Sequence, residues 1–191
     1  MQEPTTAGIG AARVLVEQGR LAEAEATLRD LLARGPDVAE ALGLLGQLRL
    51  NRGDAAAARE VLDRATQLAP DDVSSWKGLG LAERALGRSE LARVAFERAL
   101  ALDGRFFLAR LHLAQTLETL GQPELAASHY FGAVNEAQSR GRWRNDETTP
   151  PPLRAAVQHA FEQIDRHRRR IFDAVLAPFF ARYGCDELRR V

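Results

Sequence analysis

The sequence predicts an all-α protein, a solenoid of four helix-turn-helix repeats followed by a long C-terminal capping helix. The composition favours helices, because 33 Ala and 27 Leu, both strong helix formers, make up 60 of the 191 residues. No run of alternating β-branched residues is typical of a strand. Chemically similar residues also recur every 34 positions over most of the chain, which is typical of a stacked helical repeat.

The 34-residue spacing is clearest in the glycines and alanines. Glycines recur at Gly19, Gly53, Gly87 and Gly121, and alanines recur five residues later at Ala24, Ala58, Ala92 and Ala126. Four registers follow, at 5–38, 39–72, 73–106 and 107–140, and each is predicted to form a helix, a turn, a helix and a turn. The glycines allow the left-handed backbone that ends a helix, and Pro70 favours a break before the third register.

Small residues inside the helices predict close packing within each repeat. Gly46, Gly80 and Ala114 would let the two helices of a repeat approach, and the alanine series would receive large side chains from the facing helix. Enlarging one of these alanines, as in Ala92→Leu, is expected to overpack the contact by about 1–3 kcal/mol. Because one helix pair cannot bury its apolar face alone, neighbouring repeats must stack.

The third register resembles the tetratricopeptide repeat (TPR). The family's Trp, Leu-Gly, turn Gly, Ala, Phe and Ala are matched by Trp76, Leu79-Gly80, Gly87, Ala92, Phe96 and Ala99. The second register repeats most of this pattern, and the four registers cover 136 residues. Arg49 and Glu83 depart from it, because the family usually has an aromatic residue there, and the first register is degenerate in its first helix. The resemblance implies a right-handed superhelix whose concave face is lined by the first helix of each repeat.

The same resemblance implies a groove that binds an extended or helical protein segment. The family's groove positions fall on eleven polar residues. Seven are taken as site candidates, which are Arg13, Gln47, Asn51, Lys77, Arg84, Gln115 and Glu118, and the other four are Glu17, Glu40, Ser74 and Thr119. The alternative is a solvated helix face without a ligand. TPR modules that capture a C-terminal carboxylate use paired basic and amide residues, whereas the corresponding positions here hold Ile9, Arg13, Leu44, Ser74 and Gly78. Binding of a chaperone's acidic C-terminus is therefore not expected.

The tail, residues 141–191, is predicted to be a polar loop followed by an amphipathic helix. Apolar residues from Leu153 onward are spaced by three, four and seven, and Pro178 is expected to end or kink this helix. We expect part of the apolar stripe, formed by Phe172, Phe179 and Phe180, to pack on a downstream domain or on a second copy of the protein. A further helix that starts at Asp186 has no end in the sequence, which predicts a truncation before such a domain.

The tail carries a second resemblance. The segments 141–145, 149–153, 170–173 and 183–184 are similar to the connector that precedes aspartyl/asparaginyl β-hydroxylase domains in bacterial proteins. That family consists of Fe(II)/2-oxoglutarate oxygenases, but their His-x-Asp pair and distant His are not found here. The resemblance implies that the protein is the non-catalytic, N-terminal accessory or substrate-recruiting module of such an enzyme, which is the alternative to an independent scaffold.

Charge and composition exclude several other functions. The 26 basic and 26 acidic residues balance, which argues against nucleic acid as a partner, and no apolar stretch is long enough to span a membrane. No His pairs with another His or a carboxylate at ligand spacing, so we expect no metal, no cofactor and no enzyme activity. The lone Cys185 is compatible with the cytoplasm. The arginine-rich composition suggests a bacterial source, and the basic cluster 166–170 is interpreted as the solvated face of the tail helix.

Overall fold

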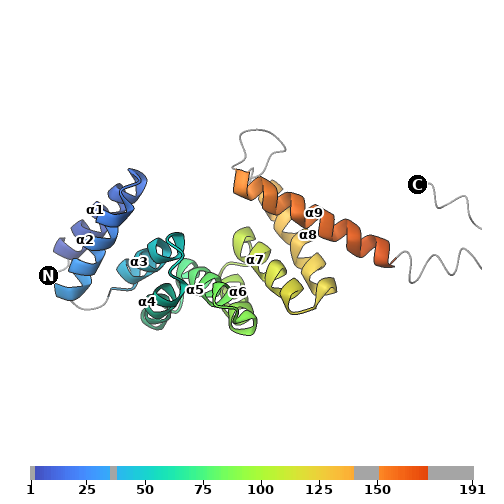
Figure 1. The fold of residues 1–191 in the computed structure, drawn as a ribbon, viewed down its shortest axis with the longest axis horizontal. Helices are drawn as coiled ribbons and strands as arrows, with labels where there is room; N and C mark the ends of the chain where they lie inside the picture. Colours follow the sequence, from blue (N-terminus) through green and yellow to red (C-terminus); the bar gives the residue numbers. More distant parts are fainter. Residues whose placement is uncertain (1–2, 35–37, 140–150, 172–191) are drawn as a thin grey trace, which may run out of the picture. The chain divides into compact units, whose positions relative to one another are not determined.

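The protein is seen here in a computed structural model, which describes residues 3–34, 38–139 and 151–171. These residues are helical with short turns, and no strand occurs among them. The helices are α1 (Glu3–Glu17), α2 (Leu21–Arg34), α3 (Ala39–Asn51), α4 (Ala55–Leu68), α5 (Val73–Ala85), α6 (Ser89–Leu102), α7 (Phe107–Thr119), α8 (Pro123–Ser139) and α9 (Pro151–Ile171) (Figure 1). The predicted all-α class is confirmed.

Contacts between residues divide the protein into two compact units, an N-terminal unit of Met1–Ala109 and a C-terminal unit of Arg110–Val191. The N-terminal unit contains the helix pairs α1/α2, α3/α4 and α5/α6, and α3 also packs directly on α5. In the C-terminal unit α9 packs along α8, as expected of a helix that covers the last repeat (Figure 1). The sequence-based division after residue 140 stays a prediction.

The four turn glycines adopt the backbone that the spacing predicts. Gly19, Gly53, Gly87 and Gly121 have φ between 72° and 81°, in the left-handed region. At each turn the residue after the glycine donates its amide to the carbonyl five residues earlier, as in the bond from Asp54 N to Arg49 O at 2.9 Å. This is the Schellman arrangement, which satisfies the last carbonyls of a helix. The sequence therefore ends four first helices by the same local mechanism.

Two repeats of the N-terminal unit place a glycine against a large buried side chain. A Cβ at Gly80 would lie 2.6 Å from the ring of Phe96, and one at Gly46 would overlap Leu62. Phe96 and Leu62 are fully buried, as are Ala58 and Ala92 of the alanine series. The predicted close approach of the paired helices is confirmed, and it depends on the missing side chain of the glycine.

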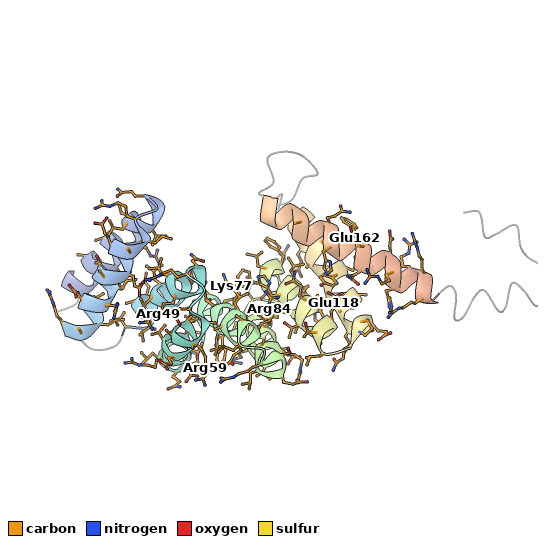
Figure 2. The ribbon with its side chains drawn as sticks, in the orientation of Figure 1. Arg49, Arg59, Lys77, Arg84, Glu118 and Glu162 are labelled. Carbon is orange, nitrogen blue, oxygen red and sulfur yellow. The ribbon has the colours of Figure 1, made fainter. Side chains whose placement is uncertain are left out.

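Ion pairs with a buried carboxylate cross the two junctions between repeats in the N-terminal unit. At the first junction Glu25 of α2 hydrogen-bonds to Arg52 and lies 3.9 Å from Arg49 Nε of α3. At the second, Arg59 Nε of α4 lies 3.0 Å from Glu83 Oε1 of α5. Both carboxylates are less than a tenth exposed, and Figure 2 labels Arg49 and Arg59 on their helices. The two departures from the family pattern, Arg49 and Glu83, are thus the partners of these pairs.

Candidate functional site

A groove of about 700 Å³ lies on the first helices of the N-terminal unit. Its walls come from α1, from α3 and from the connection that leads into α5. The lining residues are Arg13, Val16, Glu17, Ala39, Glu40, Gly43, Leu44, Gln47, Ala69, Asp72 and Ser74. Residues that are far apart in sequence meet here because the first helices of successive repeats stack side by side, with α3 in contact with α5.

The floor of the groove is one face of α3. Glu40, Gly43, Leu44 and Gln47 are spaced by three and four residues, which places them on the same side of a helix. Gly43 allows the next helix to come close, since a Cβ there would lie 3.0 Å from Ser75 Oγ. The groove therefore offers apolar contact from Leu44 and hydrogen-bonding groups from Gln47 within one helical turn.

The charged groups of the groove are mostly acidic. Arg13 Nη2 of α1 donates to Glu40 Oε1 of α3 at 2.6 Å, and both side chains are more than half exposed. Asp72 caps α5 by accepting from the amides of Ser74 at 3.2 Å and Ser75 at 2.9 Å. The lining thus contains one arginine and three carboxylates, those of Glu17, Glu40 and Asp72. A ligand with a positive charge would be favoured over one with a negative charge.

Two of the seven predicted groove residues, Arg13 and Gln47, line this groove. Asn51, Lys77 and Arg84 are on α3 and α5 but are not among its lining residues, and Figure 2 labels Lys77 and Arg84. The Lys77 ammonium lies 5.8 Å from the ring centre of Phe106. Burial lowers the pKa of Lys77, although the Asp72 carboxylate acts against this shift. Whether any of these residues binds a ligand stays a prediction.

The last two candidates, Gln115 and Glu118, belong to the C-terminal unit and make contacts inside it. Gln115 Oε1 lies 3.2 Å from His112 Nδ1. Glu118 Oε2 accepts from the buried hydroxyl of Tyr130 and lies 3.0 Å from His159 Nε2 of α9 (Figure 2). The Tyr130 and His159 rings also pack edge to face, with their centres 5.6 Å apart. Glu118 is therefore part of the contact that holds α9 on the last repeat, a role that its groove position did not predict.

Other predictions concern the tail and metal binding. The predicted interface residues Phe172, Phe179 and Phe180 lie outside the described residues, as do Cys185 and the helix expected after Asp186. Within the described ranges no three His, Cys, Asp or Glu side chains are grouped to hold a metal ion. Among the helices that are described, none combines the length and the apolar character needed to cross a membrane.

Comparison with known families gives one match that covers most of the sequence. The sequence model described as "Tetratricopeptide repeat" matches residues 9–73 and 77–141. A TPR repeat-containing protein of Pseudomonas aeruginosa is 40% identical over 74 residues, which are 39% of this chain and 70% of that protein. The CTR9 homolog of Arabidopsis thaliana is 32% identical over 104 residues, which are 54% of this chain and 9% of the plant protein's length.

Several solved structures are similar in fold. The crystal structure of MamA aligns with a TM-score of 0.66 at 19% identity, covering 73% of this chain and 81% of MamA. YrrB, described as a TPR protein with an unusual peptide-binding site, aligns with a TM-score of 0.66 at 20% identity, covering 83% of this chain and 74% of YrrB. The Yersinia enterocolitica type III secretion chaperone SycD was solved in complex with a peptide of the translocator YopD. It aligns with a TM-score of 0.57 at 19% identity, covering 69% of this chain and 92% of SycD. At these identities the likeness concerns the fold alone.

Proposed function

This chain belongs to the tetratricopeptide repeat family, and on that premise we propose that it is a non-catalytic scaffold that binds a protein or peptide segment. The segment lies in the groove of the N-terminal unit, along α1, α3 and the start of α5. The observation that carries the proposal is the groove itself, about 700 Å³ in volume and lined by the first helices of three successive repeats. Its mixture of apolar and hydrogen-bonding groups suits an extended or helical peptide.

The relatives in fold support this class of function. YrrB is described as having a peptide-binding site, and SycD was solved with a peptide of its translocator. Neither relative identifies the partner of this protein. The acidic lining favours a segment with at least one Lys or Arg, which would lie near Glu17 and Asp72.

A peptide selection followed by affinity measurement tests the groove. Peptides are selected from a displayed random library against the full-length protein, and their Kd is measured by fluorescence anisotropy. We expect Glu17→Arg and Gln47→Arg each to weaken binding at least about 10-fold, which is about 1.4 kcal/mol. Glu60→Arg is the matched control, because Glu60 is an exposed helical glutamate outside the groove. A selection that yields no binder, or equal Kd values for the groove and control variants, would refute the proposal.

The remaining sequence-based statements stay predictions. Segments 141–150 and 172–184, which carry most of the hydroxylase-connector resemblance, lie outside the described residues. An accessory role beside an oxygenase domain therefore rests on the sequence alone, as do the bacterial source and the cytoplasmic location. Contact of the tail with a second copy of the protein is also a prediction, and the sedimentation behaviour of Phe179→Glu against the wild type would test it.

A further inference from the structure

A second cavity, of about 320 Å³, lies in the C-terminal unit. It is bounded on one side by the end of α7 and the turn into α8, and on the other by the last two turns of α9. The lining residues are Glu118, Gly121, Pro123 and Ala126 on the first side, and Gln163, Arg166, His167 and Arg170 on the second. None of these residues belongs to the groove of the N-terminal unit, so the cavity is a separate candidate site.

One face of α9 supplies the basic groups. Gln163, Arg166, His167 and Arg170 are spaced by three and four residues, so they lie on the same side of the helix. Arg166 Nη1 donates to Gln163 Oε1 at 3.0 Å, which orients its guanidinium. Neither Arg166 nor Arg170 forms an ion pair with a carboxylate within the described residues. Two guanidinium groups one turn apart therefore line the cavity without any carboxylate of the described residues bound to either of them.

His167 points to the kind of ligand. Its Nδ1 atom is buried and has no hydrogen-bond partner within the described part of the protein. Buried polar atoms in folded proteins nearly always have a partner. Because the His167 side chain lines the cavity, a polar occupant would satisfy this nitrogen if the ring turned toward it. The start of α8 adds to this preference. The first backbone hydrogen bond of α8 runs from Ala126 N to Gln122 O at 3.0 Å. The amides before Ala126 form the positive end of the helix, beside Pro123.

The charge balance separates a carboxylate from a phosphate. Arg166 and Arg170 carry two positive charges, and Glu118 carries one negative charge that is also shared with Tyr130 and His159. The charges of Arg166, Arg170 and Glu118 sum to +1, which suits a monovalent anion. A phosphate group near −2 would exceed this net positive charge. Two arginine forks also match the planar geometry of a carboxylate.

We propose that this cavity binds a carboxylate of a protein segment, which is either the side-chain carboxylate of an Asp or Glu or the free carboxylate at a polypeptide's C-terminus. The basic cluster 166–170 then has two parts. Arg166 and Arg170 line the site together with His167, whereas Arg168 and Arg169 lie on the same helix outside the cavity. All four arginines are exposed. The site uses residues of the tail helix and not the groove positions by which some TPR modules capture a C-terminus.

NMR titration of the full-length protein tests the proposal. The probes are an acetylated and amidated Ala-Ala-Glu-Ala-Ala peptide, an acetylated pentaalanine with a free C-terminus, the same pentaalanine amidated, and inorganic phosphate. We expect millimolar binding of one or both carboxylate peptides, with shifts at His167 and at the Arg166 and Arg170 Nε resonances. The stronger of the two identifies the source of the carboxylate. Tighter binding of phosphate, or equal binding of the amidated pentaalanine, would overturn the assignment.

A matched pair of double variants separates a built site from general attraction to a basic helix. Arg166→Gln/Arg170→Gln and Arg168→Gln/Arg169→Gln remove the same charge from the same helix, and glutamine keeps a good helix propensity. We expect the first pair to weaken binding at least 5-fold and the second less than 2-fold, with unchanged helix content by circular dichroism. Equal losses would overturn the proposal. The groove variant Glu17→Arg is expected to bind the carboxylate probe normally, so failure of the groove proposal leaves this one standing.

Discussion

The two junctions of the N-terminal unit use the same repeat positions with opposite charges. At the first junction Glu25 on the second helix faces Arg49 on the next repeat, and 34 residues later Arg59 faces Glu83. Each pair is separated by 24 residues in sequence. The carboxylate is the buried partner in both cases, at 9% and 6% exposure. The difference shows that the repeat fixes where a junction pair lies, while the sign of each partner is free to change.

The second arginine at each carboxylate differs in origin. Glu25 is also bonded to Arg52, which belongs to the neighbouring repeat, so both of its partners cross the junction. Glu83 has Arg88 3.5 Å from its Oε2, in the turn of its own repeat, and that oxygen accepts no hydrogen bond within the described residues. The first junction is therefore tied across the repeats by two cations and the second by one.

Reversing only the buried charge of the second junction is expected to produce the largest effect. Glu83→Arg alone places a third cation beside Arg59 and Arg88 and leaves it unpaired. Breaking a buried ion pair costs about 3–5 kcal/mol, and we expect the lower end because Arg59 and Arg88 are partly exposed and can turn toward water. In the double variant Arg59→Glu/Glu83→Arg the pair is restored with reversed signs. Urea unfolding should show that more than half of the lost stability returns.

The control for this cycle is an exposed charge reversal away from the junctions. Arg98→Glu on α6 is suited to it, because Arg98 is exposed, and we expect a change below about 0.5 kcal/mol. Additive effects of Arg59→Glu and Glu83→Arg would mean that the two residues do not interact across the junction. The charge order of the second junction would then have no effect on its stability.

An intermediate effect is expected where a helix glycine lies against a large apolar side chain, a contact that the second and third repeats share. Gly80→Ala places a methyl group 2.6 Å from the buried ring of Phe96, and overpacking of this kind costs about 1–3 kcal/mol. The higher helix propensity of alanine offsets about 1 kcal/mol of this loss. Gly10→Ala is the matched control, because Gly10 is inside α1 with no atom within 4 Å of the added group. If urea unfolding shows the two variants equally stabilised, the helices of the third repeat are not held at the distance described.

The comparison also explains which parts of the molecule the sequence could predict. The 34-residue spacing predicted the helix pairs and the left-handed turn glycines because each depends on local residues that recur in every repeat. The family pattern does not predict the junction pairs because it describes each repeat position by itself, and in it Arg49 and Glu83 are only departures. Considering positions 24 residues apart together would have revealed Glu25 with Arg49 and Arg59 with Glu83 as complementary.

The candidate sites were predicted less completely than the fold. Arg13 and Gln47 line the groove, since helical periodicity is enough to place them on a first-helix face. The contact of Glu118 with His159 joins residues 41 apart across a segment outside the repeat period, so no spacing could indicate it. The cavity beside Arg166 and Arg170 depends on where α9 packs, which the amphipathic pattern of the tail does not specify.

The smallest predicted effect concerns Lys77, the one lysine of the sequence, whose surroundings contrast with the paired charges of the junctions. Its ammonium faces the ring of Phe106, and burial lowers its pKa below the ordinary value of 10.5. In the pH range between the lowered pKa and 10.5, the folded protein has released a proton that the unfolded protein still binds. The free energy of unfolding therefore rises with pH through this range, because the cost of burying the charged lysine disappears. The gain is lost again as the pH falls through the lowered pKa.

Comparison with Lys77→Met isolates this contribution, because methionine keeps an unbranched stem and every other titrating group is common to both proteins. We expect the variant to be at least as stable as the wild type at pH 7, and its advantage to shrink as the pH is raised toward 10.5. Urea unfolding at pH 7, 8, 9 and 10 measures the difference at each step. An advantage that grows with pH would mean that the charged lysine is favoured in the folded state. Lys77 would then resemble the junction arginines, with attraction from Asp72 and Phe106 outweighing the loss of hydration.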